Sequence, residues 1–215
     1  ILIGLVGSEM CIRDRKGERA LRIGMKAKDS VYSDAITALS KNEPPKECGY
    51  LEFKREMGSD KKYSNENMPK ESYSPEELSA EVLKELKSLI NDETVNSVVI
   101  TVPAMFTAIQ KDATMKAARI AGFKQCELLQ EPIAACMAYG LSSEKKDGKW
   151  LVFDFGGGTF DAALVKVEDG ILTVFDTEGD NYLGGKNLDE AVVNKILMPS
   201  LKEDYALSSY CLLYT

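Results

Sequence analysis

Three glycines and a threonine between two apolar segments are the residues in this sequence best suited to chemistry. Residues 153–161 read FDFGGGTFD. Glycine lacks a Cβ atom, so its backbone can adopt unusual dihedral angles and approach an oxyanion closely. The successive amide N–H groups of Gly156, Gly157 and Gly158 can form an anion-binding concavity, and the Thr159 hydroxyl adds a further donor. We therefore expect a tight hairpin that binds phosphate oxygens.

Two carboxylates, Asp154 and Asp161, flank this turn. Carboxylates beside a phosphate cradle would repel a phosphorylated ligand, so their presence favours Mg²⁺ and its waters between the two. A purely structural turn is the alternative for the three glycines alone. A P-loop is excluded because no GKS or GKT follows the glycines. Asp154-Phe155-Gly156 matches the DFG of protein kinases, but that signature requires an upstream HRD loop, and the sequence contains no histidine.

The lack of histidine limits the chemistry of the whole chain. It excludes Ser-His-Asp and Cys-His catalysis and histidine-ligated metal sites. The five cysteines form no CxxC pair and no short metal-ligand spacing, so we interpret them as buried thiols in a reducing compartment. Carboxylates, lysine, hydroxyls and backbone amides must therefore carry any reaction.

The overall composition predicts a globular protein without nucleic-acid or membrane partners. The chain has 215 residues, of which 44% are hydrophobic and 28% charged, enough to bury a core in one domain or two small lobes. Its net charge of −7 would repel nucleic acid and anionic membranes over most approaches. No apolar run reaches the length of a membrane span. We expect a cytoplasmic protein.

Helix and strand signals alternate in the part of the chain before the glycine turn. Ser74, Pro75 and Glu77 form a capping box that predicts a helix with one apolar face. Residues 98–102 are a short β-branched run, typical of a strand buried on both faces, and Pro103 ends it. A second capping box, at Thr107 and Gln110, predicts the start of a further helix, and Gly122 predicts its end. A strand at 126–129 and a helix from Glu131 are predicted to follow.

A polar loop at 142–149 separates these elements from those around the glycine turn, and we interpret it as the boundary between two lobes.

Residues 16–56 show no strong element, and residues 57–73 are polar and predict a surface loop. The order of elements predicts an α/β fold with mixed sheets. The elements predicted after the boundary are strands at 150–155, 160–167 and 171–177 and a helix at 187–197.

The two ends of the chain are related at the level of DNA. Residues 10–15, MCIRDR, can be back-translated into DNA whose reverse complement, read one base out of frame, encodes residues 211–215, CLLYT. This DNA resembles the transposon ends used to prepare sequencing libraries. We therefore interpret residues 1–15 and 210–215 as adapter translation, which would not belong to the fold, and expect them to make few contacts. The genuine chain would then be truncated on both sides.

Several segments in series resemble the 70-kDa heat-shock protein chaperone family, within the actin-like ATPase superfamily. FDFGGGTFD is similar to the family's second phosphate motif. The segments VVITVPAMF, ATMKAARIAGF and LLQEPIAACMAYGL before it and GDNYLGGKNLD after it lie in the family's order, and LEFKREMG, further upstream, resembles the family's lysine-arginine-glycine segment. The resemblance covers about residues 50–198. It implies an incomplete actin-like (ribonuclease H-like) α/β fold, with part of lobe I at 16–148 and the start of lobe II at 149–209.

The resemblance also implies four catalytic residues. Lys54 would lie near the γ-phosphate of ATP and help to position the attacking water. Glu131 would belong to the network around the magnesium waters. Asp154 and Asp161 would hold the hydration shell of Mg²⁺ through water and orient the nucleophile.

Further positions follow from the same resemblance. The hairpin at 156–159 would bind phosphate oxygens, and Gly184 and Gly185 would lie beside the nucleotide in the second lobe. Pro103 and Lys111 would lie on the path that couples nucleotide state to a substrate-binding domain.

A member of this family would bind ATP or ADP with Mg²⁺ and couple hydrolysis to binding and release of unfolded polypeptide clients. A J-domain co-chaperone and a nucleotide exchange factor are the implied partners. An actin-like filament ATPase and a sugar or acetate kinase of the same superfamily remain alternatives. The EPIAACMAYG and LGGKNLD segments favour the chaperone, and no kinase substrate aspartate is evident before the lobe boundary.

Some positions depart from the family's pattern, which indicates a divergent member. Met105 stands where the family usually has an aromatic residue and Lys111 where it has an arginine. Lysine keeps the charge but lacks the bidentate fork, so this departure bears on interdomain coupling and not on phosphate chemistry. The family's NEPTAAA is QEPIAAC here, with Gln130, Ile133 and Cys136.

Overall fold

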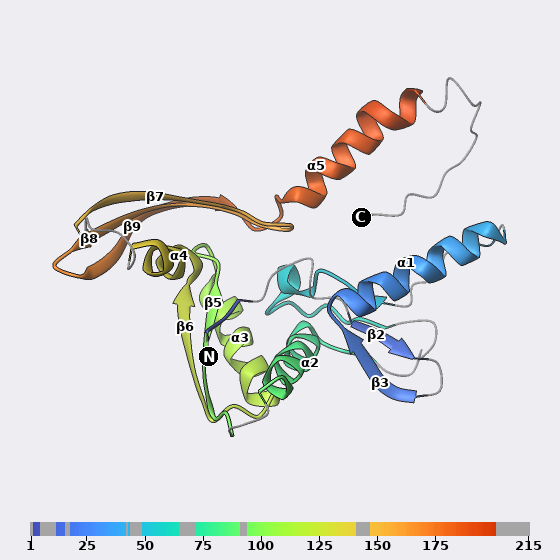
Figure 1. Ribbon diagram of the computed structural model, residues 1–215, viewed down its shortest axis with the longest axis horizontal. Helices are drawn as coiled ribbons and strands as arrows, with labels where there is room; N and C mark the ends of the chain where they lie inside the picture. The colour runs from blue at the N-terminus through green and yellow to red at the C-terminus, as the bar shows by residue number, and fades with distance from the viewer. Residues whose placement is uncertain are drawn as a thin grey trace.

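The chain combines helices with three-stranded sheets, and three such sheets occur in the part that the structure describes (Figure 1). The structure is a computed structural model that carries the whole chain. It confirms the predicted α/β class, but the prediction of mixed sheets is wrong for the described residues, because each of their sheets is purely parallel or purely antiparallel. In none of the described helices does an apolar stretch long enough to cross a bilayer occur. The described residues are 2–4, 12–15, 18–41, 43, 49–64, 72–90, 94–140 and 147–200.

The first sheet is parallel and holds the main core. Its order is β1 (Leu2–Gly4), β5 (Ser97–Val102), β6 (Gln125–Gln130), with β5 in the centre. Helices α2 (Pro75–Ser88) and α3 (Ala108–Ile120) contact each other, and α3 also packs against β6. The core that they enclose with β5 includes Phe53, Leu78, Leu83, Ile100 and Ala117.

Both predicted capping boxes are confirmed. The Ser74 hydroxyl accepts the Glu77 amide at 3.3 Å, and the Glu77 carboxylate accepts the Ser74 amide at 2.7 Å. Thr107 and Gln110 repeat the arrangement at the start of α3. These local bonds satisfy helix N–H groups that would otherwise lack partners, which is why sequence alone located both helix starts.

The N-terminal region is more ordered than expected. The absence of strong elements predicted for residues 16–56 is wrong: α1 (Met25–Ser40) and the turn η2 (Phe53–Glu56) lie there. The second sheet, ordered β3-β2-β4, contains β2 (Ile12–Arg15), β3 (Glu18–Ile23) and β4 (Gly49–Tyr50). The buried positions of α1 include Ala27 and Ala35, small side chains that give only a weak periodic signal.

For residues 2–4 and 12–15, the described part of the N-terminal segment, the expectation of few contacts is also wrong. Leu2–Gly4 pair in parallel with residues 99–101 of β5, and Ile12–Arg15 pair with both β3 and β4. Ile3 and Ile12, which are β-branched, suit strand positions whatever the origin of the DNA. Their origin as adapter translation stays a prediction that source DNA would test, and residues 210–215 lie outside the described residues.

The segment predicted as a surface loop at 57–73 is partly packed. Met57 is buried, and Tyr63 and Tyr73 form a β-bridge with two backbone hydrogen bonds of 2.9 and 2.8 Å. Both tyrosine rings contact the ring of buried Tyr50 edge-on, with centroids 6.4 and 5.6 Å away. The polar composition of residues 57–73 gives no sign of this tyrosine cluster, because its aromatic residues are too far apart in the sequence to form a periodic pattern.

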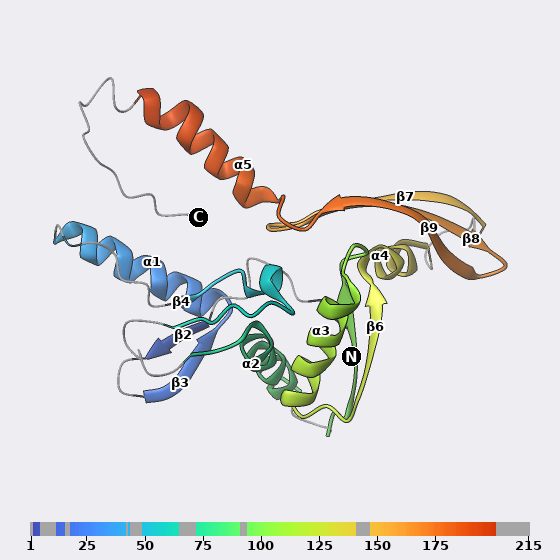
Figure 2. The same cartoon turned by 180° about the vertical axis from the view of Figure 1, so that it is seen from behind.

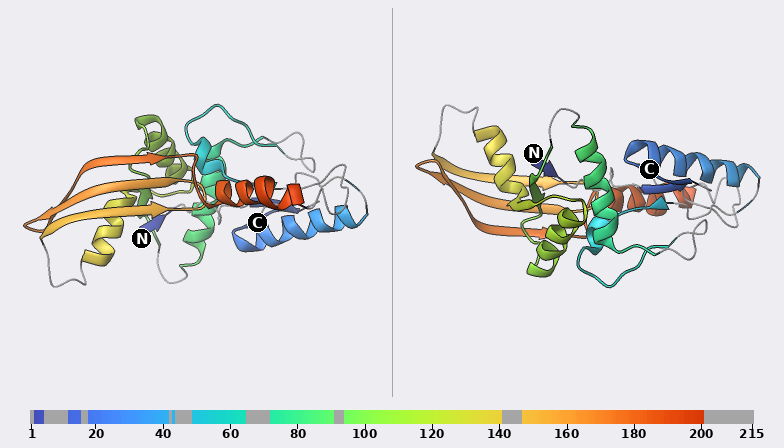
Figure 3. Two further views of the ribbon diagram at one scale, coloured as in Figure 1. Left: turned by 90° about the horizontal axis from the view of Figure 1, so that it is seen from above. Right: turned by 90° about the horizontal axis from the view of Figure 1, so that it is seen from below.

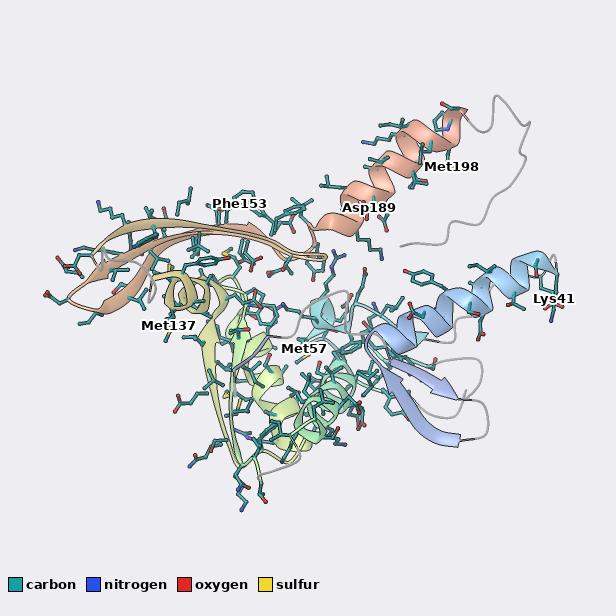
Figure 4. The ribbon with its side chains drawn as sticks, in the orientation of Figure 1. Lys41, Met57, Met137, Phe153, Asp189 and Met198 are labelled. Carbon is teal, nitrogen blue, oxygen red and sulfur yellow. The ribbon has the colours of Figure 1, made fainter. Side chains whose placement is uncertain are left out.

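The third sheet is an antiparallel meander of β7 (Gly148–Phe155), β8 (Phe160–Glu168) and β9 (Ile171–Asp180). Helix α4 (Glu131–Gly140) packs against one face, and the same arrangement is visible from behind (Figure 2). Phe153 projects from the opposite face and is 67% exposed (Figure 4). The predicted hairpin and third strand are confirmed, although β9 continues three residues beyond the predicted end at 177.

Helix α5 (Gly185–Val192) follows β9 and continues as a π-helical turn, Val193–Leu197. It starts two residues before the predicted position. Seen from above and below, it extends away from the end of the β7–β9 sheet (Figure 3). The N-terminus of α5 therefore lies where the glycine hairpin also ends, which brings the two predicted glycine segments together.

Candidate functional site

The glycine turn is the tight hairpin that the sequence predicts. It joins β7 to β8, and the Gly156 amide donates to the Thr159 carbonyl at 3.0 Å. Asp154 lies directly opposite Asp161 in the strand register. Residues opposite each other in an antiparallel pair project to the same face, so the hairpin places both carboxylates on one side of the sheet.

The second glycine pair lies against this hairpin. The Gly185 amide donates to the Gly156 carbonyl at 2.9 Å, and the Lys186 amide donates to the Gly157 carbonyl at 3.2 Å. A Cβ atom on Gly184 would collide with the backbone of Gly157 and of the next glycine. The close approach itself requires glycine at 184. The dihedral angle does not, since its φ of −164° is ordinary extended backbone that any residue can adopt. The structure thus brings Gly184 and Gly185 to the predicted phosphate turn.

The predicted lysine and glutamate form an ion pair. Lys54 Nζ donates to Glu131 Oε1 at 3.0 Å, across 77 residues of sequence. Lys54 lies on η2, and Glu131 is the first residue of α4, directly after β6. Both side chains are largely buried, with 9% and 15% of their surfaces exposed. A buried pair of this kind is strongly destabilised when one partner is removed, because the other charge is left uncompensated.

Glu131 is influenced by all three other predicted catalytic residues. Burial raises the pKa of its carboxyl above the ordinary value, and the charge and hydrogen bond of Lys54 lower it. The negative charges of Asp154 and Asp161 raise it further. The four side chains therefore form one electrostatic group, although they come from three separate parts of the sequence.

Asp161 is the most deeply buried of the three carboxylates, with 3% of its surface exposed. Burial raises its pKa, hydrogen bonds from the Met105 and Ala104 amides lower it, and the charge of Asp154 raises it. Its Oδ1 atom is buried and has no hydrogen-bond partner within the described residues. An unsatisfied buried carboxylate oxygen is costly, so it indicates that a further group belongs beside it.

This donor set fits a hydrated cation better than a directly bound one. In the described part of the chain, no three acidic, cysteine or histidine residues are close enough together to hold a metal ion by themselves. Mg²⁺ commonly keeps several waters and binds through one or two carboxylates plus phosphate oxygens. Asp161, with its free Oδ1, and Asp154 opposite it are the residues that would hold such waters.

Two contacts of the hairpin region were not predicted. Arg55, next to Lys54, donates to Asn187 on α5 at 3.1 Å, across 132 residues. Gly179 on β9 lies so close to Asp161 and to the Phe160 carbonyl that a Cβ atom would collide with that carbonyl. A glycine within a strand pattern is a signal for such an approach, whereas no local pattern predicts the arginine contact.

Of the two residues implied in interdomain coupling, Pro103 lies next to residues that bind Asp161. Pro103 is fully buried at the end of β5, and the two amides that follow it are those that bind Asp161. Met105 Sδ also accepts from the Thr177 hydroxyl on β9 at 3.6 Å. Lys111 lies on the first turn of α3 and is half-buried. The residues after β5 are thus bonded to Asp161, while the coupling roles of Pro103 and Lys111 stay predictions.

A family model described as Hsp70 protein matches residues 38–208. The matched range contains the Lys54–Glu131 pair, both aspartates, the glycine hairpin and the glycines at the start of α5.

Proposed function

Since this chain belongs to the Hsp70 family of chaperone ATPases, we propose that its residues form part of a nucleotide-binding domain that hydrolyses ATP with Mg²⁺. The domain would be an incomplete actin-like ATPase fold, divided into lobes at 16–148 and 149–209. One observation carries the proposal. A buried lysine–glutamate pair and two opposed aspartates surround a glycine hairpin that a second glycine segment contacts.

The hairpin would bind the phosphates of the nucleotide. The amides of Gly157 and Gly158 and the Thr159 hydroxyl are donors on a turn whose shape is already closed by the Gly156–Thr159 bond. Preorganised donors cost no rearrangement when charge develops during the reaction. A Cβ atom at Gly184 would meet the backbone of Gly157 and Gly158, so glycine at this position lets the start of α5 lie directly against the hairpin.

The charged group would promote attack of water on the γ-phosphate. Mg²⁺, when bound, supplies positive charge between the phosphate oxygens and the carboxylates. Asp154 and Asp161 would orient its waters, and Lys54 would steady the attacking water and the developing negative charge. Glu131 holds the Lys54 ammonium in place at 3.0 Å. Phosphoryl transfer depends on positioning and electrostatics, and this arrangement provides both.

The proposal extends to the whole protein. Hydrolysis would drive lobe movement coupled to binding and release of unfolded polypeptide clients, with a J-domain co-chaperone and a nucleotide exchange factor acting on the cycle. A cytoplasmic location is part of the same proposal. The bonds from the residues after Pro103 to Asp161 support such coupling, because they join the β5 end to the phosphate hairpin.

Replacement of Lys54 tests the catalytic assignment. In the intact gene product, Lys54→Ala should slow single-turnover ATP hydrolysis by about a hundredfold or more, through loss of one preorganised electrostatic group. Nucleotide affinity should change far less, because the glycine amides remain. Lys61→Ala is the matched control: it removes a lysine–glutamate pair of 3.1 Å at the surface and should hydrolyse ATP at the parental rate. Parental hydrolysis by Lys54→Ala would show that the assigned site is wrong.

A further inference from the structure

Arg55 connects the turn that carries Lys54 to the helix that contacts the glycine hairpin. Its Nη2 donates to Asn187 Oδ1 at 3.1 Å, and the same oxygen accepts the Gly184 amide at 3.0 Å. Lys54, the preceding residue, pairs instead with Glu131. Two adjacent residues of η2 therefore make the two long-range polar contacts of this turn, one to the carboxylate group and one to α5. Figure 1 shows η2, the short cyan turn, beneath the junction of the β7–β9 sheet with α5.

A second pair of charges connects the same two segments. Glu52 Oε1 accepts from Lys186 Nζ at 2.8 Å, and its Oε2 lies 3.8 Å from Arg55 Nη1. Glu52 has a φ of 58°, a left-handed conformation that costs energy for a residue with a side chain. Such residues persist where their surroundings hold them in place. The four residues Glu52, Arg55, Lys186 and Asn187 are called the Arg55 bridge below.

The Arg55 bridge also touches the hairpin itself. A Cβ atom on Gly158 would lie 3.0 Å from Arg55 Nε, so the guanidinium lies directly against the glycine backbone. The Arg55 side chain is 13% exposed, and its Nε is buried without a hydrogen-bond partner among the described residues. Bonds from Gly185 and Lys186 to the hairpin carbonyls complete the assembly. The bridge, the first turn of α5 and the hairpin are thus one bonded unit.

We propose that Arg55 is a positioning residue that fixes the distance between the Lys54 ammonium and the glycine hairpin. Lys54 belongs to the segment before the lobe boundary and the hairpin to the segment after it, so a contact between the segments must set their separation. Arginine suits this role because its planar fork presents several donors in fixed directions, which lysine cannot. The catalytic part of this inference rests on the proposed function, whereas the bridge itself does not.

Hydrogen exchange of the Gly185 and Lys186 amides in the intact gene product tests the bridge. Arg55→Ala should accelerate their exchange by about tenfold, the effect of losing one hydrogen bond to a charged group. Asn187→Ala should do the same or more, and the double variant should exchange no faster than the faster single variant. Asn187→Asp keeps the acceptor oxygen and should exchange at the parental rate. Amides of Ile100 and Leu128, in the parallel sheet, report that the fold is retained.

Hydrolysis and affinity measured beside exchange separate positioning from mere stability. Arg55→Ala should slow single-turnover hydrolysis by about tenfold or more, because small misplacements of a catalytic group are costly. Its affinity for Mg-ATP should fall by less than about threefold, since hydrogen bonds within the hairpin remain. Parental exchange in Arg55→Ala, or multiplicative effects in the double variant, would overturn the bridge. Faster exchange with parental hydrolysis would overturn the positioning role.

The same experiment distinguishes this inference from the proposed function. If the parent protein does not hydrolyse ATP, the proposed function fails, and amide exchange still decides whether Arg55 joins the two segments. If Arg55→Ala changes the exchange of neither amide while the parent hydrolyses ATP, the bridge fails and the proposed function stands. If Arg55→Ala does not fold, amide exchange in Asn187→Ala compared with Asn187→Asp decides whether the contact between Arg55 and Asn187 joins the two segments.

Discussion

Asparagine in place of Asp154 or Asp161 removes a charge from the site while keeping the size of the side chain. Each substitution should slow ATP hydrolysis far more than it weakens nucleotide binding, because the amide cannot order cationic waters as a carboxylate does. Single-turnover hydrolysis measured beside nucleotide affinity in the intact gene product separates the two effects. Asp176→Asn, at an exposed position on β9 of the same sheet, should behave as the parent. Unchanged hydrolysis in both site variants would contradict the assigned roles.

The burial of Asp161 predicts a pH dependence of stability. In the native state the pKa of the Asp161 carboxyl lies above its ordinary value of 3.8. At a pH between the ordinary pKa and the native pKa, the native state therefore binds more protons than the unfolded state. Stability contributed by this carboxyl is therefore present at lower pH and is lost as pH rises through that window. Asp161→Asn should lose less stability over the same rise. Part of the slope should remain, because the pKa of Glu131 is raised as well.

Urea unfolding at a series of pH values from about 4 upward measures this effect. Asp189→Asn, at an exposed position on α5, is the control and should follow the parental profile. A profile for Asp161→Asn identical to that of the parent would show that the carboxyl is not buried in the native state.

At the scale of elements, the contact between α5 and the hairpin depends on Gly184. Gly184→Ala should destabilise the protein by about 1–3 kcal/mol, the usual cost of forcing extra volume into a packed contact. It should also weaken nucleotide binding, because α5 must move away from the phosphate turn. Gly185→Ala is a matched neighbour, since its Cβ would lie 3.8 Å from the Gly156 carbonyl, an ordinary contact. Equal stabilities of the two variants in urea unfolding would contradict this close approach.

Element prediction succeeded where the signal was local. The Ser74 and Thr107 capping boxes, the β-branched strand at 98–102 and the glycine hairpin each depend on residues within a few positions of one another. Helix α1 was missed because its buried face contains alanines, which bury little apolar area and give weak periodicity. Side-chain spacing likewise gave no indication that residues 57–73 contain packed tyrosines.

Prediction of the site depended on the family resemblance for residues that lie far from the glycine hairpin in the sequence. Hairpin chemistry alone identified Asp154 and Asp161 as candidates. Lys54 and Glu131 lie 77 residues apart, and only the family's motifs placed them in one site. Arg55 and Asn187 lie 132 residues apart and were not identified at all, because a contact across that separation leaves no periodic pattern.

On the scale of the whole molecule, the hairpin lies in a sheet that helix α4 covers on one face within the described residues. Helix α4 packs under the β7–β9 sheet through Cys136 against Ala163 and Val165. The other face exposes Phe153 (Figure 4). The centroid of its ring lies 4.9 Å from the ring centroid of Phe160. Helix α5 leaves the end of this sheet, and α5 and the π-helical turn after it expose further apolar residues, among them Leu188, Val192 and Ile196. The phosphate hairpin therefore lies at the margin of an open surface in this 215-residue chain.

This open surface bears on how the 215-residue chain binds nucleotide. FDFGGGTFD resembles the second phosphate motif of the family, which implies a first, and the sequence contains one glycine hairpin of this type. A single hairpin would supply only part of the phosphate donors that two such motifs provide. The binding free energy of Mg-ATP should fall well short of that of a micromolar complex, about −8 kcal/mol.

Calorimetric titration of the 215-residue chain with Mg-ATP measures this directly, with the intact gene product as the positive control. Weak or undetectable heat from the chain beside a clear isotherm from the intact protein is the expected result. Micromolar or tighter binding by the chain would mean that the hairpin, α5 and the Arg55 bridge suffice to hold the nucleotide. In that case the family's first phosphate motif would contribute to hydrolysis rather than to affinity, since the donors of the hairpin, α5 and the Arg55 bridge would already provide the binding energy.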